Sequence, residues 1–140
     1  MHRIARYVLV LLAVCRASTA AETPVGQVGY DAEIARTLYI THCSACHGAD
    51  GEGHPGTFPP IKGSRVVTKD NATKHIQVVL DGMKGAKAGG VLYAAPMPSF
   101  GAGLSNTDIA YIIDYERSSW GNHGKPVSAA EVAAQRNRPK

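Results

Sequence analysis

The residues best able to do chemistry stand together at Cys43-Ser44-Ala45-Cys46-His47. Two thiols separated by two residues and followed directly by an imidazole form the pattern at which haem is attached through two thioether bonds. The thioethers fix one edge of the macrocycle, so the next residue is placed for axial coordination of the iron. The motif therefore predicts one haem bonded to Cys43 and Cys46, with His47 as an axial iron ligand.

Other uses of paired cysteines fit this sequence poorly. A structural zinc site needs two more soft ligands, but the third cysteine is Cys15, in a predicted signal segment, and no second pair exists. A thioredoxin-like pair follows a strand and opens a helix, whereas Cys43 and Cys46 follow a predicted helix. A structural disulfide would leave His47 without a role.

The second axial ligand must come from elsewhere in the chain. Met97 lies between Pro96 and Pro98, whose fixed φ angles stiffen the loop, so the sequence predicts Met97 as this ligand. Met83 follows a helix end in a glycine-rich run, and we expect it to be a surface or packing residue. The rivals in principle are the other histidines after the predicted signal, His42, His54, His75 and His123. Of these, His75 is the strongest because it lies on a predicted helix.

The N-terminal segment is typical of a cleavable secretory signal. A basic start is followed by an apolar run over residues 7–15 and by small residues up to Ala20 and Ala21. The run is too short to span a membrane, and no later segment is long and apolar enough to do so. We expect a periplasmic protein with a signal at 1–21, an extended leader at 22–30, a haem domain at 31–122 and a C-terminal tail at 123–140.

The formal charge of +4 overstates how basic the exported protein is. Removing the three arginines of the signal leaves twelve Lys/Arg against eleven Asp/Glu, a net charge of +1, so no nucleic-acid partner is expected. One stretch nevertheless has many cations, Lys62, Arg65, Lys69, Lys74, Lys84 and Lys87, against only Asp70 and Asp81. It is either an ordinary solvated surface or a docking surface for a redox partner.

Caps and apolar periodicity predict two helices in the first half of the chain. Asp31 can cap a helix that ends at the cysteine motif, with Ile34, Leu38, Tyr39 and His42 near one face. A second helix is predicted from Ala72 to Asp81, between Asn71 as cap and Gly82 as terminator. The glycine and proline content of residues 48–63 predicts a loop, and the glycines of residues 82–90 predict a turn.

The second half of the chain carries two capping boxes. Ser105 with Asp108 predicts a strong helix to about Trp120, and Ser128 with Glu131 predicts a short helix in the tail. No segment alternates for long as a strand would. The fold class predicted for the exported chain is therefore all-α.

The sequence resembles the class I c-type cytochromes over essentially its whole length after the signal. Pro59-Pro60-Ile61-Lys62-Gly63 is similar to the family's loop after the haem motif, and Ala35, Tyr39 and Tyr115 are similar to its contact between first and last helices. The resemblance implies that the Pro59 carbonyl accepts the Nδ1 proton of His47 and that Ile61 packs on the ring. It also implies a small cytochrome c fold with three to five helices around one covalent haem c. Other apolar residues expected to exclude water from the ring are Val79, Leu80, Leu104, Ile109 and Ile112.

A narrower likeness joins the chain to haem domains that accompany bacterial periplasmic dehydrogenases. It rests on residues 97–100, 119–122 and 127–132. The likeness implies a one-electron carrier or electron-transfer subunit that is not itself an enzyme. Its electrons would come from a dehydrogenase and pass to an oxidase or another cytochrome. The alternative is a haem sensor or peroxidase-like protein in which Met97 is a labile ligand.

Overall fold

The computed structural model describes residues 29–139, so the predicted signal and residues 22–28 of the predicted leader lie outside the described residues. The described elements are α1 (Ala32–His42), α2 (Ser44–His47), α3 (Arg65–Thr68), α4 (Thr73–Asp81), β1 (Ala86–Ala88), β2 (Val91–Tyr93), α5 (Asn106–Ser118) and α6 (Ala129–Arg136). The mainly helical architecture is the one predicted. Helices outnumber the expected three to five because α2 and α3 are single turns of four residues each.

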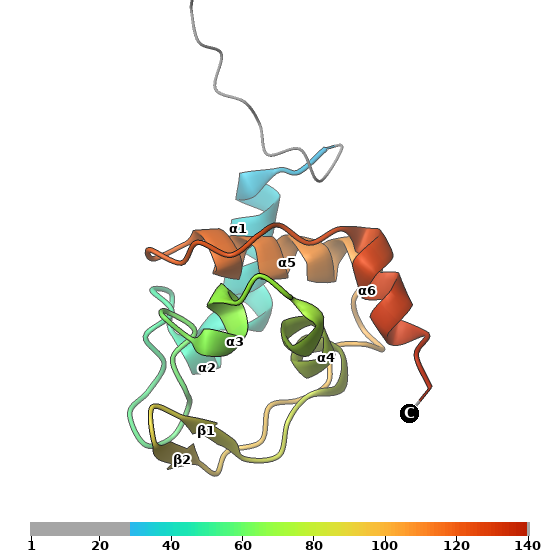
Figure 1. Cartoon of the computed structure of the whole chain (residues 1–140). Coiled ribbons are helices and arrows are strands. Elements are labelled where there is room, and N and C mark those ends of the chain that lie inside the picture. Colours follow the sequence, from blue (N-terminus) through green and yellow to red (C-terminus); the bar gives the residue numbers. More distant parts are fainter. Residues whose placement is uncertain (1–28, 140) are drawn as a thin grey trace, which may run out of the picture.

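The crossing of α1 and α5 is at the centre of the fold (Figure 1). Asp31 caps α1 as predicted, because its side chain accepts hydrogen bonds from two first-turn amides. Tyr39 and Ala35 are fully buried in the crossing, and the rings of Tyr39 and Tyr115 lie 5.2 Å apart. The apolar face predicted for this helix was wrong at one position, since Ile34 is 50% exposed.

Helix α4 begins one residue later than predicted. The N-cap position belongs to Ala72, whose methyl group cannot accept a hydrogen bond, but the Asn71 side chain still accepts one from the Thr73 amide at 2.9 Å. Gly82 ends the helix with φ of 73°, a left-handed conformation that glycine adopts without strain.

A short hairpin follows α4 where the sequence predicted only a glycine-rich turn. Strands β1 and β2 pair in antiparallel fashion with Ala88 opposite Val91, leaving Gly89 and Gly90 as a two-residue loop. Both glycines have positive φ, which suits the tight turns that match strand twist. The strands escaped prediction because three residues are too few to show alternation.

Helices α5 and α6 begin at the two predicted capping boxes, both of which are formed. Helix α5 ends at Ser118, before the predicted Trp120, because Ser119 is already extended with ψ of 163°. Helix α6 packs against α4 and α5, where Val132 is fully buried. None of the helices within residues 29–139 combines the length and apolarity that crossing a bilayer demands.

Candidate haem-binding site

The cysteine motif forms the junction between α1 and α2. The amides of Cys46 and His47 both donate to the Cys43 carbonyl, at 3.2 and 3.0 Å. Residues three apart on a helical turn share one face, so the two thiols lie on the same side. Cys43 is buried, Cys46 is half-buried, and both thiols are free.

The Cys43 thiol stays neutral at neutral pH. Burial raises its pKa well above the usual range, and the nearby carboxylate of Glu116 and the thiol of Cys46 raise it further. Redox-active cysteines show the opposite shift, because the thiolate is the reactive form. The environment of Cys43 therefore does not suit a redox-active pair.

The imidazole of His47 is oriented by the following loop. Its Nδ1 lies 2.8 Å from the carbonyl oxygen of Pro59. A carbonyl oxygen only accepts hydrogen bonds, so Nδ1 carries the proton and Nε2 keeps its lone pair. Such a bond also raises the basicity of the ring. Nε2 is therefore prepared to donate its electron pair to a metal.

Two glycines bring the loop to this imidazole. The Gly53 amide donates to the His47 carbonyl at 2.8 Å, and a β-carbon on Gly53 would lie 2.7 Å from the Pro59 oxygen. The Gly51 carbonyl accepts the amide of Ile61 at 2.8 Å. Pro59 is thus held close to His47 by contacts that no larger residue would permit at Gly53.

Ile61 lies beside the cysteine motif. It is 7% exposed and belongs to an apolar cluster with Tyr39, Cys43, Val67 and Ile112. The residue implied by the family loop therefore shares the buried environment of Cys43.

Met97 approaches from a different part of the chain. Its backbone pairs with that of Met83, and its side chain is half-buried against the core cluster that contains Ile76 and Leu80. Leu104 packs against both this cluster and the one around Cys43. The two clusters therefore adjoin, with the cysteine motif on one and Met97 on the other.

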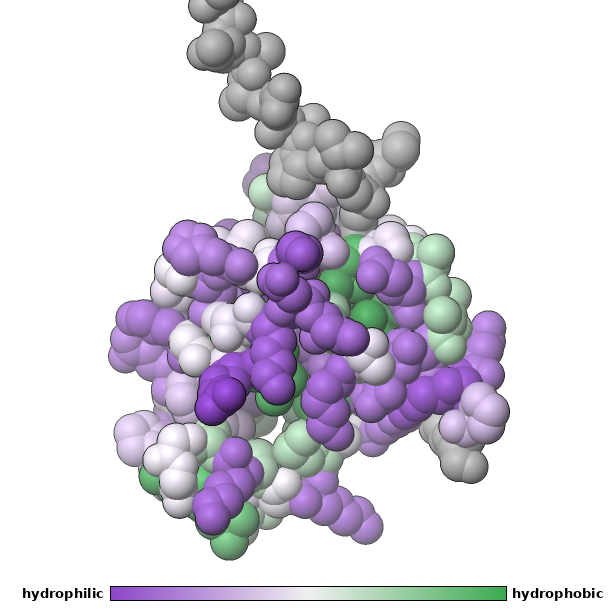
Figure 2. Space-filling model, in the orientation of Figure 1, coloured by the Kyte–Doolittle hydropathy of each residue, from purple (hydrophilic) through white to green (hydrophobic). Residues whose placement is uncertain are grey.

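The donor groups fit haem c. Two thiols, an imidazole with a free Nε2 and a half-buried thioether are the groups that covalent attachment and two axial bonds need. The apolar residues expected to exclude water are buried or half-buried, namely Ile61, Val79, Leu80, Leu104, Ile109 and Ile112. Figure 2 shows the molecule hollowed between the hairpin and the helical body.

A buried polar pair close to this site was not predicted. The Nε2 of His75 lies 2.6 Å from a carboxylate oxygen of Glu116, and both side chains are about 5% exposed or less. His75, the strongest rival ligand, thus contacts Glu116, while His54 and His123 are exposed. The available signal was the position of Glu116, four residues after Ile112 on the apolar face of α5.

Trp120 packs against aromatic residues at the crossing of α1 and α5. Its ring centroid lies 5.0 Å from that of Tyr39 and 5.4 Å from that of Tyr115. A β-carbon on Gly51 would lie 2.6 Å from a ring atom of Trp120. The end of α5 therefore supports the loop that carries Pro59 and Ile61, a contact that the sequence did not reveal.

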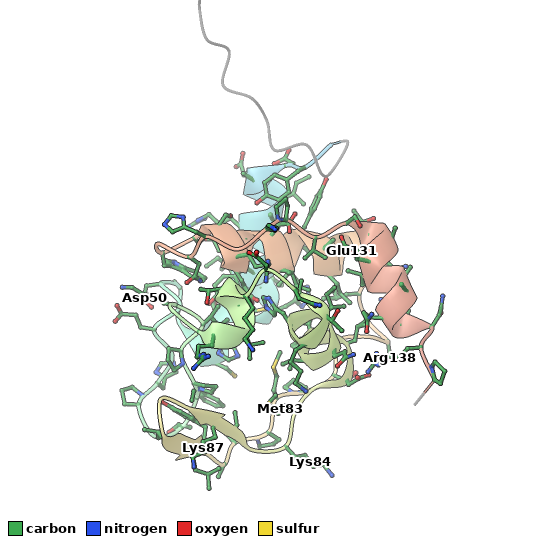
Figure 3. The ribbon with its side chains drawn as sticks, viewed as in Figure 1. Asp50, Met83, Lys84, Lys87, Glu131 and Arg138 are labelled. Carbon is green, nitrogen blue, oxygen red and sulfur yellow. The ribbon has the colours of Figure 1, made fainter. Side chains whose placement is uncertain are left out.

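The acidic residues of the predicted basic stretch are paired with cations from outside it. Its two acidic residues form ion pairs with later residues, Asp70 with Lys125 at 3.2 Å and Asp81 with Arg138. Lys84 and Lys87 are exposed at the hairpin and form no ion pair within residues 29–139 (Figure 3). Leu92 stands opposite Lys87 and is 70% exposed. Lys87 thus lies beside an exposed apolar side chain.

Comparison with known proteins agrees with this arrangement. The family model described as cytochrome c matches residues 32–120, most of the described chain. The chain belongs to the cytochrome c family. As a member of that family, this cytochrome carries covalently bound haem c and transfers electrons.

Two kinds of relative stand out among similar proteins. The chain is 34% identical over 100 residues to the cytochrome c subunit of a quinone alcohol dehydrogenase from Gluconacetobacter polyoxogenes, covering 71% of this chain and 21% of that subunit. It is 32% identical over 110 residues to the gluconate 2-dehydrogenase cytochrome c subunit of Pantoea cypripedii, covering 77% and 25%. It is also 33% identical over 99 residues to cytochrome c-552 of Thermus thermophilus, covering 64% and 75%. This cytochrome therefore spans about a quarter or less of the dehydrogenase subunits.

Proposed function

We propose that this cytochrome is an exported, periplasmic one-electron carrier or electron-transfer subunit. In this proposal Cys43 and Cys46 hold the haem covalently, while His47 and Met97 are its axial ligands. The observation that carries the proposal is the hydrogen bond from His47 Nδ1 to the Pro59 carbonyl at 2.8 Å, because it leaves Nε2 as the only nitrogen free for a metal.

The protein residues would set the conditions for electron exchange. When bound, the haem supplies one-electron exchange between ferric and ferrous iron. Pro59 orients the His47 ring and raises its basicity. Met97 offers a soft thioether, a ligand type that raises the reduction potential relative to a second imidazole. Ile61 and its apolar neighbours exclude water. With both axial positions filled by side chains, no position remains for substrate.

The partners proposed are a dehydrogenase as electron donor and an oxidase or another cytochrome as acceptor. The names of the similar subunits support the first of these. Contacts between electron-transfer proteins are small and transient, so surface charge acts mainly on the rate of encounter. Lys84 and Lys87 are the candidates for attracting an acidic partner because both are exposed, neither is paired within the described chain, and both lie at the hairpin, where Leu92 is also exposed.

The proposal is tested with haem-loaded protein and fractions of its own host. Oxidised cytochrome is mixed with periplasmic and membrane fractions, and haem reduction is followed by absorbance after adding an alcohol, an aldehyde or a sugar acid. Substrate-dependent reduction supports the proposal. The reduced protein is also exposed to carbon monoxide at neutral pH, where a spectral shift would favour the sensor or peroxidase alternative with a labile Met97.

Charge variants separate docking from the chemistry. Replacing Lys84 and Lys87 with glutamine should slow reduction at low salt and leave the rate at high salt nearly unchanged. The control replaces Lys69 and Lys74, two exposed lysines away from the hairpin, and should have a smaller effect. Equal effects of the two double variants would contradict a docking surface at the hairpin.

A further inference from the structure

Met83 and Met97 are joined by a reciprocal pair of backbone hydrogen bonds. The Met83 amide donates to the Met97 carbonyl at 3.0 Å, and the Met97 amide donates to the Met83 carbonyl at 2.9 Å. The pairing is antiparallel. Residues that exchange both bonds stand directly opposite one another, and their side chains leave the ladder on the same side. The two thioethers therefore start from neighbouring positions on one face.

Close backbone packing fixes this pair in place. A β-carbon on Gly82 would lie 2.4 Å from the Met97 carbonyl oxygen, so only glycine allows the approach. Beyond Met97, the Ser99 hydroxyl donates to the Leu80 carbonyl at 2.6 Å and the Phe100 amide donates to the Val79 carbonyl at 3.1 Å. The segment with Met97 is thus attached to the end of α4, immediately before Met83.

Both methionine side chains are half-buried. In Figure 3 the Met83 side chain extends from its backbone toward the helical body, whereas that of Lys84 extends away from it. The Met83 side chain therefore lies on the inner side of this segment, facing the helical body. The sequence suggested a surface or packing role, and the pairing with Met97 now gives this side chain a specific neighbour.

We propose that Met83 is a reserve axial ligand that can take the sixth position of the iron when Met97 leaves it. The proposal rests on the proposed function, in which Met97 is the native ligand. Directly opposite residues of this type have Cα atoms about 5.5 Å apart, and a methionine side chain with three rotatable bonds can reach across such a distance. In the exchange one iron–sulfur bond breaks and another forms, with no change of oxidation state or protonation.

The consequence is an iron site that stays closed to small ligands. Loss of Met97 would otherwise leave the iron free for small ligands, as in the sensor or peroxidase alternative. With Met83 beside it, one thioether replaces another and the iron stays six-coordinate. Electron transfer would then continue when the iron loses Met97.

Three haem-loaded variants test the proposal: Met97→Ala, Met83→Leu and the double variant. The readouts are the thioether-to-ferric-iron charge-transfer band of the oxidised protein and the rate of carbon monoxide binding to the reduced protein. We expect Met97→Ala to keep a thioether band and to bind carbon monoxide at least tenfold more slowly than the double variant. Where the alanine cavity prevents haem loading, Met97→Leu keeps the volume and serves in its place.

The outcomes separate the two proposals. If Met97→Ala loses the band and binds carbon monoxide as fast as the double variant, Met97 stands as the native ligand and the reserve role of Met83 is refuted. If Met83→Leu alone loses the band, the native ligand is Met83 and both assignments fail. If the unmutated protein shows no thioether band, the assignment of Met97 as an axial ligand in the proposed function is refuted.

Discussion

The buried contact between His75 and Glu116 yields the sharpest prediction about stability. Their side chains are 5% and 4% exposed, and the nitrogen and oxygen lie 2.6 Å apart. Removing one member of a buried pair costs about 3–5 kcal/mol, because the other is left without its partner. Replacing both by apolar residues is neutral or stabilising by about 1–4 kcal/mol. The two single variants and the double variant should therefore behave in opposite ways.

We expect His75→Leu and Glu116→Leu each to lower the free energy of unfolding by about 3–5 kcal/mol. For a domain of this size, a loss of about 3 kcal/mol lowers the thermal midpoint by roughly 10–20 °C. The double variant should be close to the native protein in stability. The interaction energy from this double-mutant cycle should therefore be about 6 kcal/mol or more.

The assay is urea unfolding of the haem-loaded proteins at pH 7, followed by far-ultraviolet circular dichroism. Equal slopes against urea concentration would show that the variants unfold from comparable states. Lys74→Leu introduces the same residue at an exposed position of α4 and should change stability by less than about 0.5 kcal/mol. The reasoning is refuted if the single variants cost less than about 1 kcal/mol, or if the double variant loses the sum of the two.

Three further predictions concern residues around the site. Arg117 is fully buried and donates to three backbone carbonyls at 2.6–2.7 Å. Because three acceptors lose a charged donor, Arg117→Met should lower the free energy of unfolding by more than about 3 kcal/mol in urea. A loss below about 1 kcal/mol would contradict this. Burial raises the pKa of Asp114 to about 6, so the folded protein binds this proton more tightly than the unfolded chain, and stability should fall as pH rises from about 4 to about 6. Asp114→Asn lacks this titration, and its stability relative to the native protein should rise by about 1–3 kcal/mol between pH 4 and pH 7; a constant difference would show that the carboxyl is not perturbed. Gly51→Ala adds a β-carbon 2.6 Å from the Trp120 ring, whereas the β-carbon of Gly56→Ala meets nothing within 4 Å at a similar φ. In thermal unfolding the first variant should therefore lose at least about 1 kcal/mol more stability than the second. Equal losses would rule out the Trp120 contact.

Local interactions explain why most helices could be predicted. The capping boxes at Ser105 and Ser128 and the cap at Asp31 join residues two or three apart, so their energetics are contained in short segments. The hairpin could not be predicted in this way. Its strands are three residues long, and their pairing depends on the turn at Gly89 and Gly90 as much as on the strands themselves.

The sequence by itself determined the family and the kind of cofactor, because the two cysteines and His47 lie within a single turn. Their spacing alone therefore matches the pattern of haem attachment. Family membership and haem c are supported by the comparison, while the individual ligands stay predictions. The contact between His47 and Pro59 was expected from resemblance, and the structure places these atoms at hydrogen-bonding distance.

Only the tertiary structure decided which distant residues meet. His75 and Glu116 are 41 positions apart, and Glu116 taken alone is an ordinary helix residue. The pairing of Met83 with Met97 likewise depends on a chain reversal between them. Such contacts form because α4 and α5 pack in one particular way, and burial then makes a polar partner obligatory. Periodicity shows which face of a helix is buried, but the partner across the interface is set by the packing of the whole domain.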